Sequence, residues 1–137
     1  MPGPRVVLVD DNPEFMERVR EFLDDFCIIG SFLNGSDLLD AWDELRPDVM
    51  ILDISMSPLT GLQLAPKLAE QGYGGPIVFL TMHNDGDMVR AALAAGGSAY
   101  VLKSHMAHEL VPALHAVLAG RRFLSASLPE AWPENLP

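Results

Sequence analysis

Five polar residues lie at the ends of short apolar runs in this sequence, and their types could together transfer a phosphoryl group. They are Asp10, Asp11, Asp53, Thr81 and Lys103. A carboxylate can act as the nucleophile toward phosphorus when a metal ion, a lysine and a hydroxyl group neutralise the charge of the transferred oxygens. Asp53 is then the expected nucleophile, and Asp10 and Asp11 are expected to hold the metal. Lys103 and the Thr81 hydroxyl are expected to contact the phosphoryl oxygens.

Three carboxylates in one place repel one another, and the cost of ionising all of them falls when a cation lies among them. Carboxylate oxygens favour Mg²⁺, which binds one or two carboxylates, keeps several waters and accepts phosphate oxygens. Taken singly, an acidic residue after a strand is more often a helix cap or a surface charge. The five residues together, each after an apolar strand, favour a phosphoryl-transfer site over coincidental caps.

The apolar runs themselves predict a parallel β-sheet, because runs without polar alternation are typical of strands buried on both faces. The predicted strands are Arg5–Val9, Cys27–Leu33, Val49–Leu52, Pro76–Leu80 and Ala99–Leu102. Parallel strands place their carboxyl ends at one edge of the sheet, which is where ligands bind in open α/β sheets. The five polar residues are therefore expected to converge there.

Helical patterns separate the predicted strands. Asn12-Pro13 favours a helix start, with Asn as the N-cap and Pro at the first position. Pro66 falls inside the third predicted helix, so a kink or a late start is expected there, and Ser104 is expected to cap the last helix. Five alternating strands and helices predict a doubly wound, three-layer α/β domain with right-handed crossovers.

Length and charge limit the classes of protein that this chain can represent. Its 137 residues are enough for one domain with a core, and a net charge of −10 disfavours direct binding to nucleic acid or to an anionic membrane. No apolar run approaches the length of a membrane span, so a cytoplasmic protein is expected. We expect the domain to occupy residues 1–120, and residues 121–137, with three prolines, to be a C-terminal tail or the stub of a linker.

The ordered set of two acids, a third acid, a threonine and a lysine resembles the receiver domain of two-component response regulators. Met56 and Gly61 also match the family's loop after its phosphorylated aspartate, and residues 80–83 and 95–103 are most similar to the nitrate-regulator subfamily. The resemblance extends from about Arg5 to Gly120. It implies a flavodoxin-like fold with five parallel strands in the order 2-1-3-4-5 and helices on both faces.

The resemblance also implies a function. Asp53 would accept a phosphoryl group from a sensor histidine kinase or a phosphotransfer protein. Mg²⁺ would be bound directly by Asp11 and Asp53, by Asp10 through water, and by the backbone carbonyl of Ser55. Such domains catalyse their own phosphorylation and dephosphorylation but are not conventional turnover enzymes. Members of the subfamily usually carry a carboxyl-terminal helix-turn-helix domain and regulate transcription, and the 17 residues after Gly120 are too few to form such a domain.

Thr81 and Tyr100 match the family's switch pair. A phosphoryl group on Asp53 would draw the Thr81 hydroxyl toward it, and Tyr100 would change rotamer to fill the space that this leaves. The surface that changes would be the fourth helix, fifth strand and fifth helix, where Met88, Met106 and His108 could meet a partner or a second copy of the chain. The alternative is that Tyr100 is a fixed, half-buried aromatic residue with its hydroxyl at the surface.

Two functions of other classes remain as alternatives. A phosphatase of the haloacid-dehalogenase type also forms an aspartyl phosphate, but it requires an acid two residues after the nucleophile, where this chain has Ser55. A phosphorylation-independent pseudo-receiver would be an interaction module, but such modules typically lose an acidic residue or the lysine.

This chain departs from the family at two positions. The family's loop after the phosphorylated aspartate commonly has proline where this chain has Ser57, and the position after the switch threonine, here Met82, is often a small residue. Both departures bear on the rate and lifetime of phosphorylation.

Overall fold

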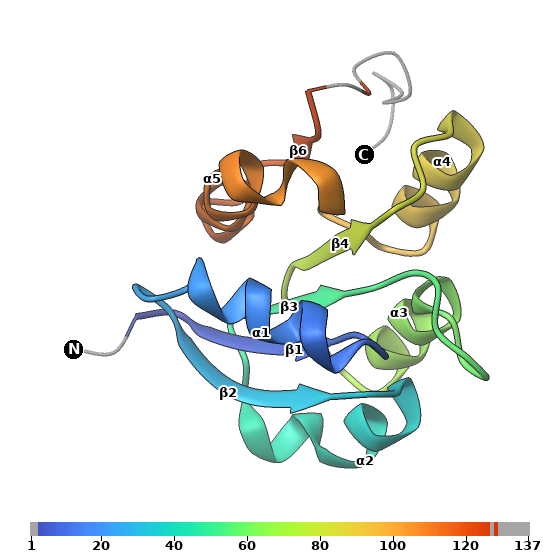
Figure 1. Ribbon diagram of the computed structural model, residues 1–137. Coiled ribbons are helices and arrows are strands. Elements are labelled where there is room, and N and C mark those ends of the chain that lie inside the picture. The colour runs from blue at the N-terminus through green and yellow to red at the C-terminus, as the bar shows by residue number, and fades with distance from the viewer. Residues whose placement is uncertain (1–2, 127, 129–137) are drawn as a thin grey trace.

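The computed structural model describes residues 3–126 and 128, in which strands and helices alternate around one sheet (Figure 1). The elements are β1 (Arg5–Val9), α1 (Pro13–Glu21), β2 (Cys27–Phe32), α2 (Gly35–Leu45), β3 (Val49–Leu52), α3 (Gly61–Glu70), β4 (Ile77–Thr81), α4 (Gly86–Ala94), β5 (Ala99–Leu102), a 3₁₀ turn (Lys103–His105), α5 (Met106–Leu118) and β6 (Phe123–Leu124). No helix among these is long and apolar enough to cross a membrane.

The sheet has the order β2-β1-β3-β4-β5-β6, and every neighbouring pair is parallel. The five predicted strands and their order are thus confirmed. The sixth strand was not predicted: Phe123 and Leu124, which the sequence placed in a tail, pair with Ala99 and Tyr100 of β5. Phe123 and Leu124 therefore extend the sheet by one short strand at its β5 edge.

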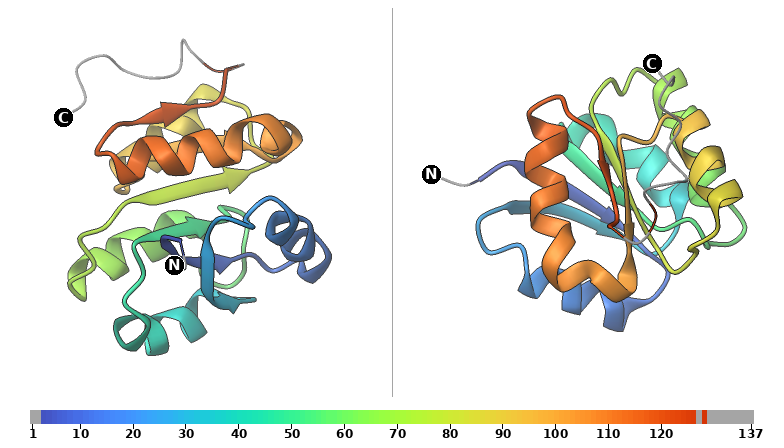
Figure 2. Two further views of the ribbon diagram at one scale, coloured as in Figure 1. Left: turned by 90° about the vertical axis from the view of Figure 1, so that its left-hand side faces the viewer. Right: turned by 90° about the horizontal axis from the view of Figure 1, so that it is seen from above.

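Helices cover both faces of the sheet, and two hydrophobic cores result (Figure 2). Because side chains alternate between the two faces along a strand, Val6 and Leu8 pack toward α1 and α5, whereas Val7 and Val9 pack toward α2, α3 and α4. Met106 is buried in the core beneath α1 and α5. The expectation that it meets a partner at the surface is therefore wrong.

Local sequence signals account for most helix starts. The Asn12 side chain accepts a hydrogen bond from the Phe15 N–H at 3.1 Å, and Pro13 opens α1, as predicted. Two expectations about helix starts are wrong. A late start of α3 at Pro66 is not observed, because the capping box of Thr60 and Gln63 starts this helix before the proline. Ser104 does not cap α5, because a 3₁₀ turn comes first.

Candidate functional site

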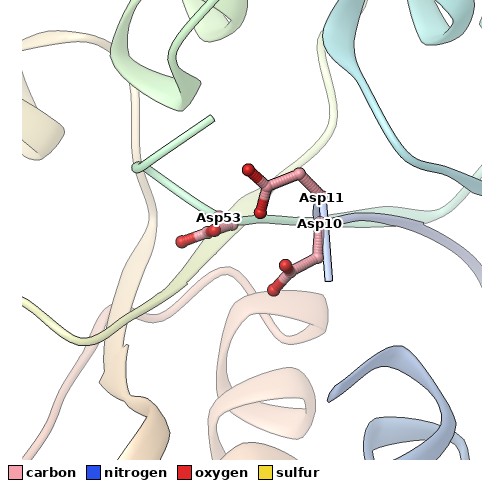
Figure 3. Close-up of side chains that lie close together, drawn as sticks. All are labelled: Asp10, Asp11 and Asp53. Atoms are coloured by element: carbon pink, nitrogen blue, oxygen red, sulfur yellow. The ribbon is translucent and has the colours of Figure 1, made fainter. Parts of the chain in front are cut away.

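Three carboxylates gather where β1 and β3 end (Figure 3). Backbone hydrogen bonds hold both chain segments: the Asp10 N–H donates to the Phe32 carbonyl at 3.1 Å, and the Asp53 N–H donates to the Val9 carbonyl at 3.0 Å. Asp10, Asp11 and Asp53 each present an oxygen within 4.8 Å of the others. Asp10 is 2% exposed and Asp53 is 4% exposed, while Asp11 lies at the surface.

Lys103 completes this cluster from the first position after β5. Its Nζ lies 2.8 Å from an oxygen of Asp10 and 3.6 Å from an oxygen of Asp53. The same ammonium group lies 4.2 Å from the centre of the Phe15 ring, a distance that allows a cation–π interaction. The sequence indicated Phe15 only as an apolar residue of α1. Its contact with the lysine depends on how α1 and β5 are placed around β1.

Two backbone N–H groups orient the buried carboxylates. The Asn12 N–H donates to Asp10 at 2.9 Å, and the Ser55 N–H donates to Asp53 at 3.3 Å. Each bond occupies an Oδ1 atom, while the Lys103 contacts are to the Oδ2 atoms. The carboxylates are therefore held in fixed orientations before any ligand binds.

The charges of the cluster suit a divalent cation. Three carboxylates and one ammonium group sum to −2, and the donors that face one another are carboxylate oxygens, which Mg²⁺ prefers. An acidic cluster of this composition fits Mg²⁺ better than a transition metal, since no cysteine or histidine belongs to this group. The role expected of the Ser55 carbonyl as a metal ligand stays a prediction.

Burial, the chief cause, and then the charge of Asp10 raise the pKa of Asp53 above 3.8, the ordinary value for an aspartate. Lys103 and the Ser55 N–H act in the opposite direction but do not cancel the increase. The folded protein thus holds a proton on Asp53 more tightly than the unfolded chain does. Without metal, the contribution of Asp53 to the free energy of unfolding falls as pH rises from 3.8 through the raised pKa of this residue.

A metal ion must displace that proton, so we expect Mg²⁺ affinity to depend on pH. Below the raised pKa of Asp53, the affinity should fall by up to about tenfold for each pH unit, and above that pKa this dependence should vanish. Calorimetric titrations with Mg²⁺ over a pH series would measure it. Asp53→Asn should remove this part of the dependence; an identical pH profile in that variant would contradict the assignment to Asp53.

Thr81 and Tyr100 meet at the backbone of His83. The buried Thr81 hydroxyl accepts a hydrogen bond from the His83 N–H at 3.3 Å, and the Tyr100 hydroxyl donates to the His83 carbonyl at 2.8 Å. The Tyr100 ring is completely buried, so the alternative of a half-buried ring with its hydroxyl at the surface is wrong. The His83 imidazole is hydrogen-bonded to the Ser55 hydroxyl. His83 thus links Ser55, at the site, to both Thr81 and Tyr100.

No sequence pattern indicated a role for His83, because two of its three hydrogen bonds use the backbone, and a backbone hydrogen bond does not depend on residue type. The structure thus joins Thr81 to Tyr100 through one residue. Tyr100 itself lies in the hydrophobic core on the face of the sheet that carries α4.

A cavity of about 310 Å³ opens over the cluster. It is lined by Asp11, Asn12, Asp53, Ser55, Met82, His83 and Lys103. Met82 is 81% exposed at this rim. A group that approaches Asp53 therefore passes a flexible apolar side chain.

Gly61 sets the shape of the loop that follows Asp53. A Cβ atom at this position would lie 2.3 Å from the Asp53 carbonyl oxygen, and the Gly61 N–H donates to the Ile54 carbonyl at 2.9 Å. The contact is with backbone, which cannot move aside as a side chain can. We expect Gly61→Ala to lower the free energy of unfolding by roughly 1–3 kcal/mol.

Urea unfolding of Gly61→Ala measures this loss, and Gly74→Ala is the matched control, because a Cβ at Gly74 meets no atom within 4 Å. Equal stability of the two variants would show that the loop adjusts without cost. A selective loss in Gly61→Ala would confirm that α3 must approach the Asp53 backbone closely.

The fold and the site together define a class: a flavodoxin-like α/β domain with an acidic, lysine-containing site at the carboxyl edge of its sheet. Residues 6–115 match the family model described as "Response regulator receiver domain". The chain belongs to this family, the receiver domains of two-component response regulators.

Individual relatives agree with this assignment. The chain is 32% identical, over 90% of its length, to the nitrate/nitrite response regulator protein NarL of Escherichia coli K12, and it spans 58% of that protein's length. A two-component response regulator of the LuxR family from Aurantimonas sp. SI85-9A1 has 28% identity and a TM-score of 0.87, with 94% of each chain covered. The isolated apo receiver domain of RcsB from Salmonella enterica serovar Typhimurium has 26% identity and a TM-score of 0.84, with 93% of this chain and 97% of that one covered.

Proposed function

We propose that this receiver domain accepts a phosphoryl group on Asp53 from a histidine kinase or a phosphotransfer protein, in a reaction that requires Mg²⁺. The observation that carries the proposal is the placement of Lys103, whose ammonium group lies 2.8 Å from Asp10 and 3.6 Å from Asp53 at the floor of the open cavity. An aspartate beside a lysine and two further carboxylates, open to solvent on one side, suits an acceptor of phosphate.

In this reaction an Asp53 oxygen forms a bond to phosphorus while the bond from phosphorus to the donor's imidazole nitrogen breaks. The imidazole leaves with the bonding electron pair and is protonated. Lys103 then pairs with a phosphoryl oxygen, and the Thr81 hydroxyl, once it leaves the His83 N–H, donates to another. Asp10, Asp11 and Asp53 would hold Mg²⁺, which when bound neutralises charge on the transferred oxygens.

The phosphoryl group changes the protein through charge. It adds nearly two negative charges and strong acceptor oxygens at Asp53, and these compete for the Thr81 hydroxyl. Tyr100, bonded to the same His83, is the residue placed to respond. We propose that the output is a change in a partner-binding or dimerisation surface in the cytoplasm, in a regulator of transcription. A phosphorylation-independent module would keep the fold and lack this chemistry.

Incubation with acetyl phosphate and Mg²⁺, followed by intact-mass spectrometry, tests the proposal. A receiver gains a single phosphoryl group that persists over the time of the measurement, and chelation of Mg²⁺ prevents the gain. Continuous release of phosphate without a stable adduct would indicate a phosphatase instead. No adduct at any Mg²⁺ concentration would indicate a pseudo-receiver.

A further inference from the structure

The segment after α5 crosses the outer edge of the sheet and is bound there at several points. We call it the strap, and its described residues are Phe123–Ala126 and Leu128. In Figure 2 (right) β6 lies between α5 and α4. Its pairing with β5 covers only two residues, and the Ser125 N–H adds a bond of 2.9 Å to the Tyr100 carbonyl. So short a strand contributes few backbone bonds, and other contacts must hold the strap.

Glu109 of α5 provides those contacts. This buried carboxylate accepts hydrogen bonds from the Ser125 hydroxyl and from the Ala126 N–H, the latter at 2.9 Å. Ser125 is completely buried, and its hydroxyl also lies 3.4 Å from the Leu102 N–H. Within the described residues Glu109 forms no ion pair. A buried carboxylate without a cation needs hydrogen-bond donors. The strap supplies these donors to Glu109, and Glu109 in turn holds the strap against α5.

The far end of the strap packs over the switch. Leu128 is buried in the hydrophobic core that contains Tyr100, Val89 and Ala92, on the α4 side of the sheet. The strap therefore bonds to the backbone of Tyr100 and closes the core around its ring. A Tyr100 ring that swung outward at this edge would have to displace the strap.

We propose that the strap is a detachable element whose docking is coupled to the buried position of Tyr100, with Glu109 as its latch. This proposal rests on the proposed function, because it names the segment that carries the signal from the phosphorylation site. Phosphorylation, by drawing Thr81 away from His83, selects one position of Tyr100, and the strap docks more tightly or more loosely as a result. The chain's own C-terminal segment is thus the first partner of the α4–β5–α5 face.

The latch is tested by amide hydrogen exchange followed by NMR, in unphosphorylated protein without Mg²⁺. In Glu109→Ala, the Ser125 and Ala126 amides should exchange at least about tenfold faster than in wild type, while the amides of β1 keep their protection. Glu109→Gln retains an acceptor oxygen and should show a smaller increase. Glu44→Ala, which removes an exposed carboxylate from α2, is the control and should have no effect. Unchanged exchange at Ser125 and Ala126 in Glu109→Ala would overturn the latch.

The coupling is tested in the same samples. Glu109 and Tyr100 share no hydrogen bond within the described residues, and the coupling predicts that Glu109→Ala, which loosens the strap, also changes the Tyr100 ring signals, because coupling between two sites acts in both directions. Faster strap exchange with unchanged ring signals would overturn the coupling. Adding Mg²⁺ and beryllofluoride to wild type should alter Ser125 exchange, and the same addition to Asp53→Asn should not.

The two proposals fail in different ways. If beryllofluoride shifts the signals around Asp53 but leaves the strap's exchange unchanged, the coupling is wrong and the proposed function stands. If it shifts no signal around Asp53, the proposed function fails, while the experiments on Glu109 still decide whether the strap and Tyr100 are linked.

Discussion

Replacing Asp53 by asparagine is expected to abolish phosphoryl incorporation from acetyl phosphate. The amide has no carboxylate oxygen to bond phosphorus, and the other two acids of the cluster are poor substitutes: Asp10 is buried and does not line the cavity, and Asp11 forms no ion pair with Lys103 in the described part of the chain. Intact-mass spectrometry after incubation with Mg²⁺ would show no adduct in Asp53→Asn and a single adduct in wild type.

The same variant is expected to gain stability without metal. The raised pKa of Asp53 means that its ionised form is unfavourable in the folded protein, chiefly because it is buried and then because of Asp10. Asparagine has nearly the same shape and no charge. At neutral pH the free energy of unfolding should rise by about 1 kcal/mol, measured by urea unfolding with a chelator present.

Asp43→Asn is the matched control for both the intact-mass and the urea measurements, because it removes an exposed carboxylate from α2. It should incorporate phosphate like wild type and leave stability almost unchanged. Full labelling of Asp53→Asn would show that another residue is the acceptor. A loss of labelling that accompanied unfolding would be visible in the urea measurement and would not count in favour of Asp53.

Replacing Asp11 by asparagine is expected to weaken Mg²⁺ binding by about tenfold or more, equivalent to at least about 1.4 kcal/mol. The change reduces the negative charge of the cluster from −2 to −1 and removes one of its three carboxylates. Asp11 is the exposed member, so it can bind the ion without a large rearrangement of the core. Calorimetric titration with Mg²⁺ measures the effect.

Glu14→Gln separates ligation from general electrostatics. Glu14 lies in the first turn of α1, is exposed and is not a member of the acidic cluster, so its replacement changes the net charge equally without removing a ligand. Its Mg²⁺ affinity should stay within about twofold of wild type at moderate salt, since exposed charges are screened. Equal losses in Asp11→Asn and Glu14→Gln would mean that Asp11 acts only as a distant charge.

The sequence alone determined the parallel sheet, the alternation of strands and helices along the chain, and the residues that meet at the edge of the sheet. Continuous apolar runs require burial on both faces, and a parallel sheet then brings every strand end to the same edge. Asp10, Asp11, Asp53 and Lys103 could therefore be placed together although as many as 93 positions separate the first from the last.

Tertiary structure decided what lies around that site. The contact of Lys103 with the Phe15 ring and the bonds of His83 to Thr81 and Tyr100 depend on the distance between packed elements. Backbone donors and acceptors are the same in nearly every residue, so no residue type marks them.

The strap is the clearest case of a contact that residue patterns do not reveal. A strand of two residues is too short for a periodic pattern, and Glu109 resembles any acid on a helix until Ser125 and Ala126 are brought against it. Patterns of period 2 or 3.6 report which face of an element is buried. Which distant segment covers that face is decided only when the chain has packed, because that choice depends on the shape and hydrogen-bonding groups of both surfaces.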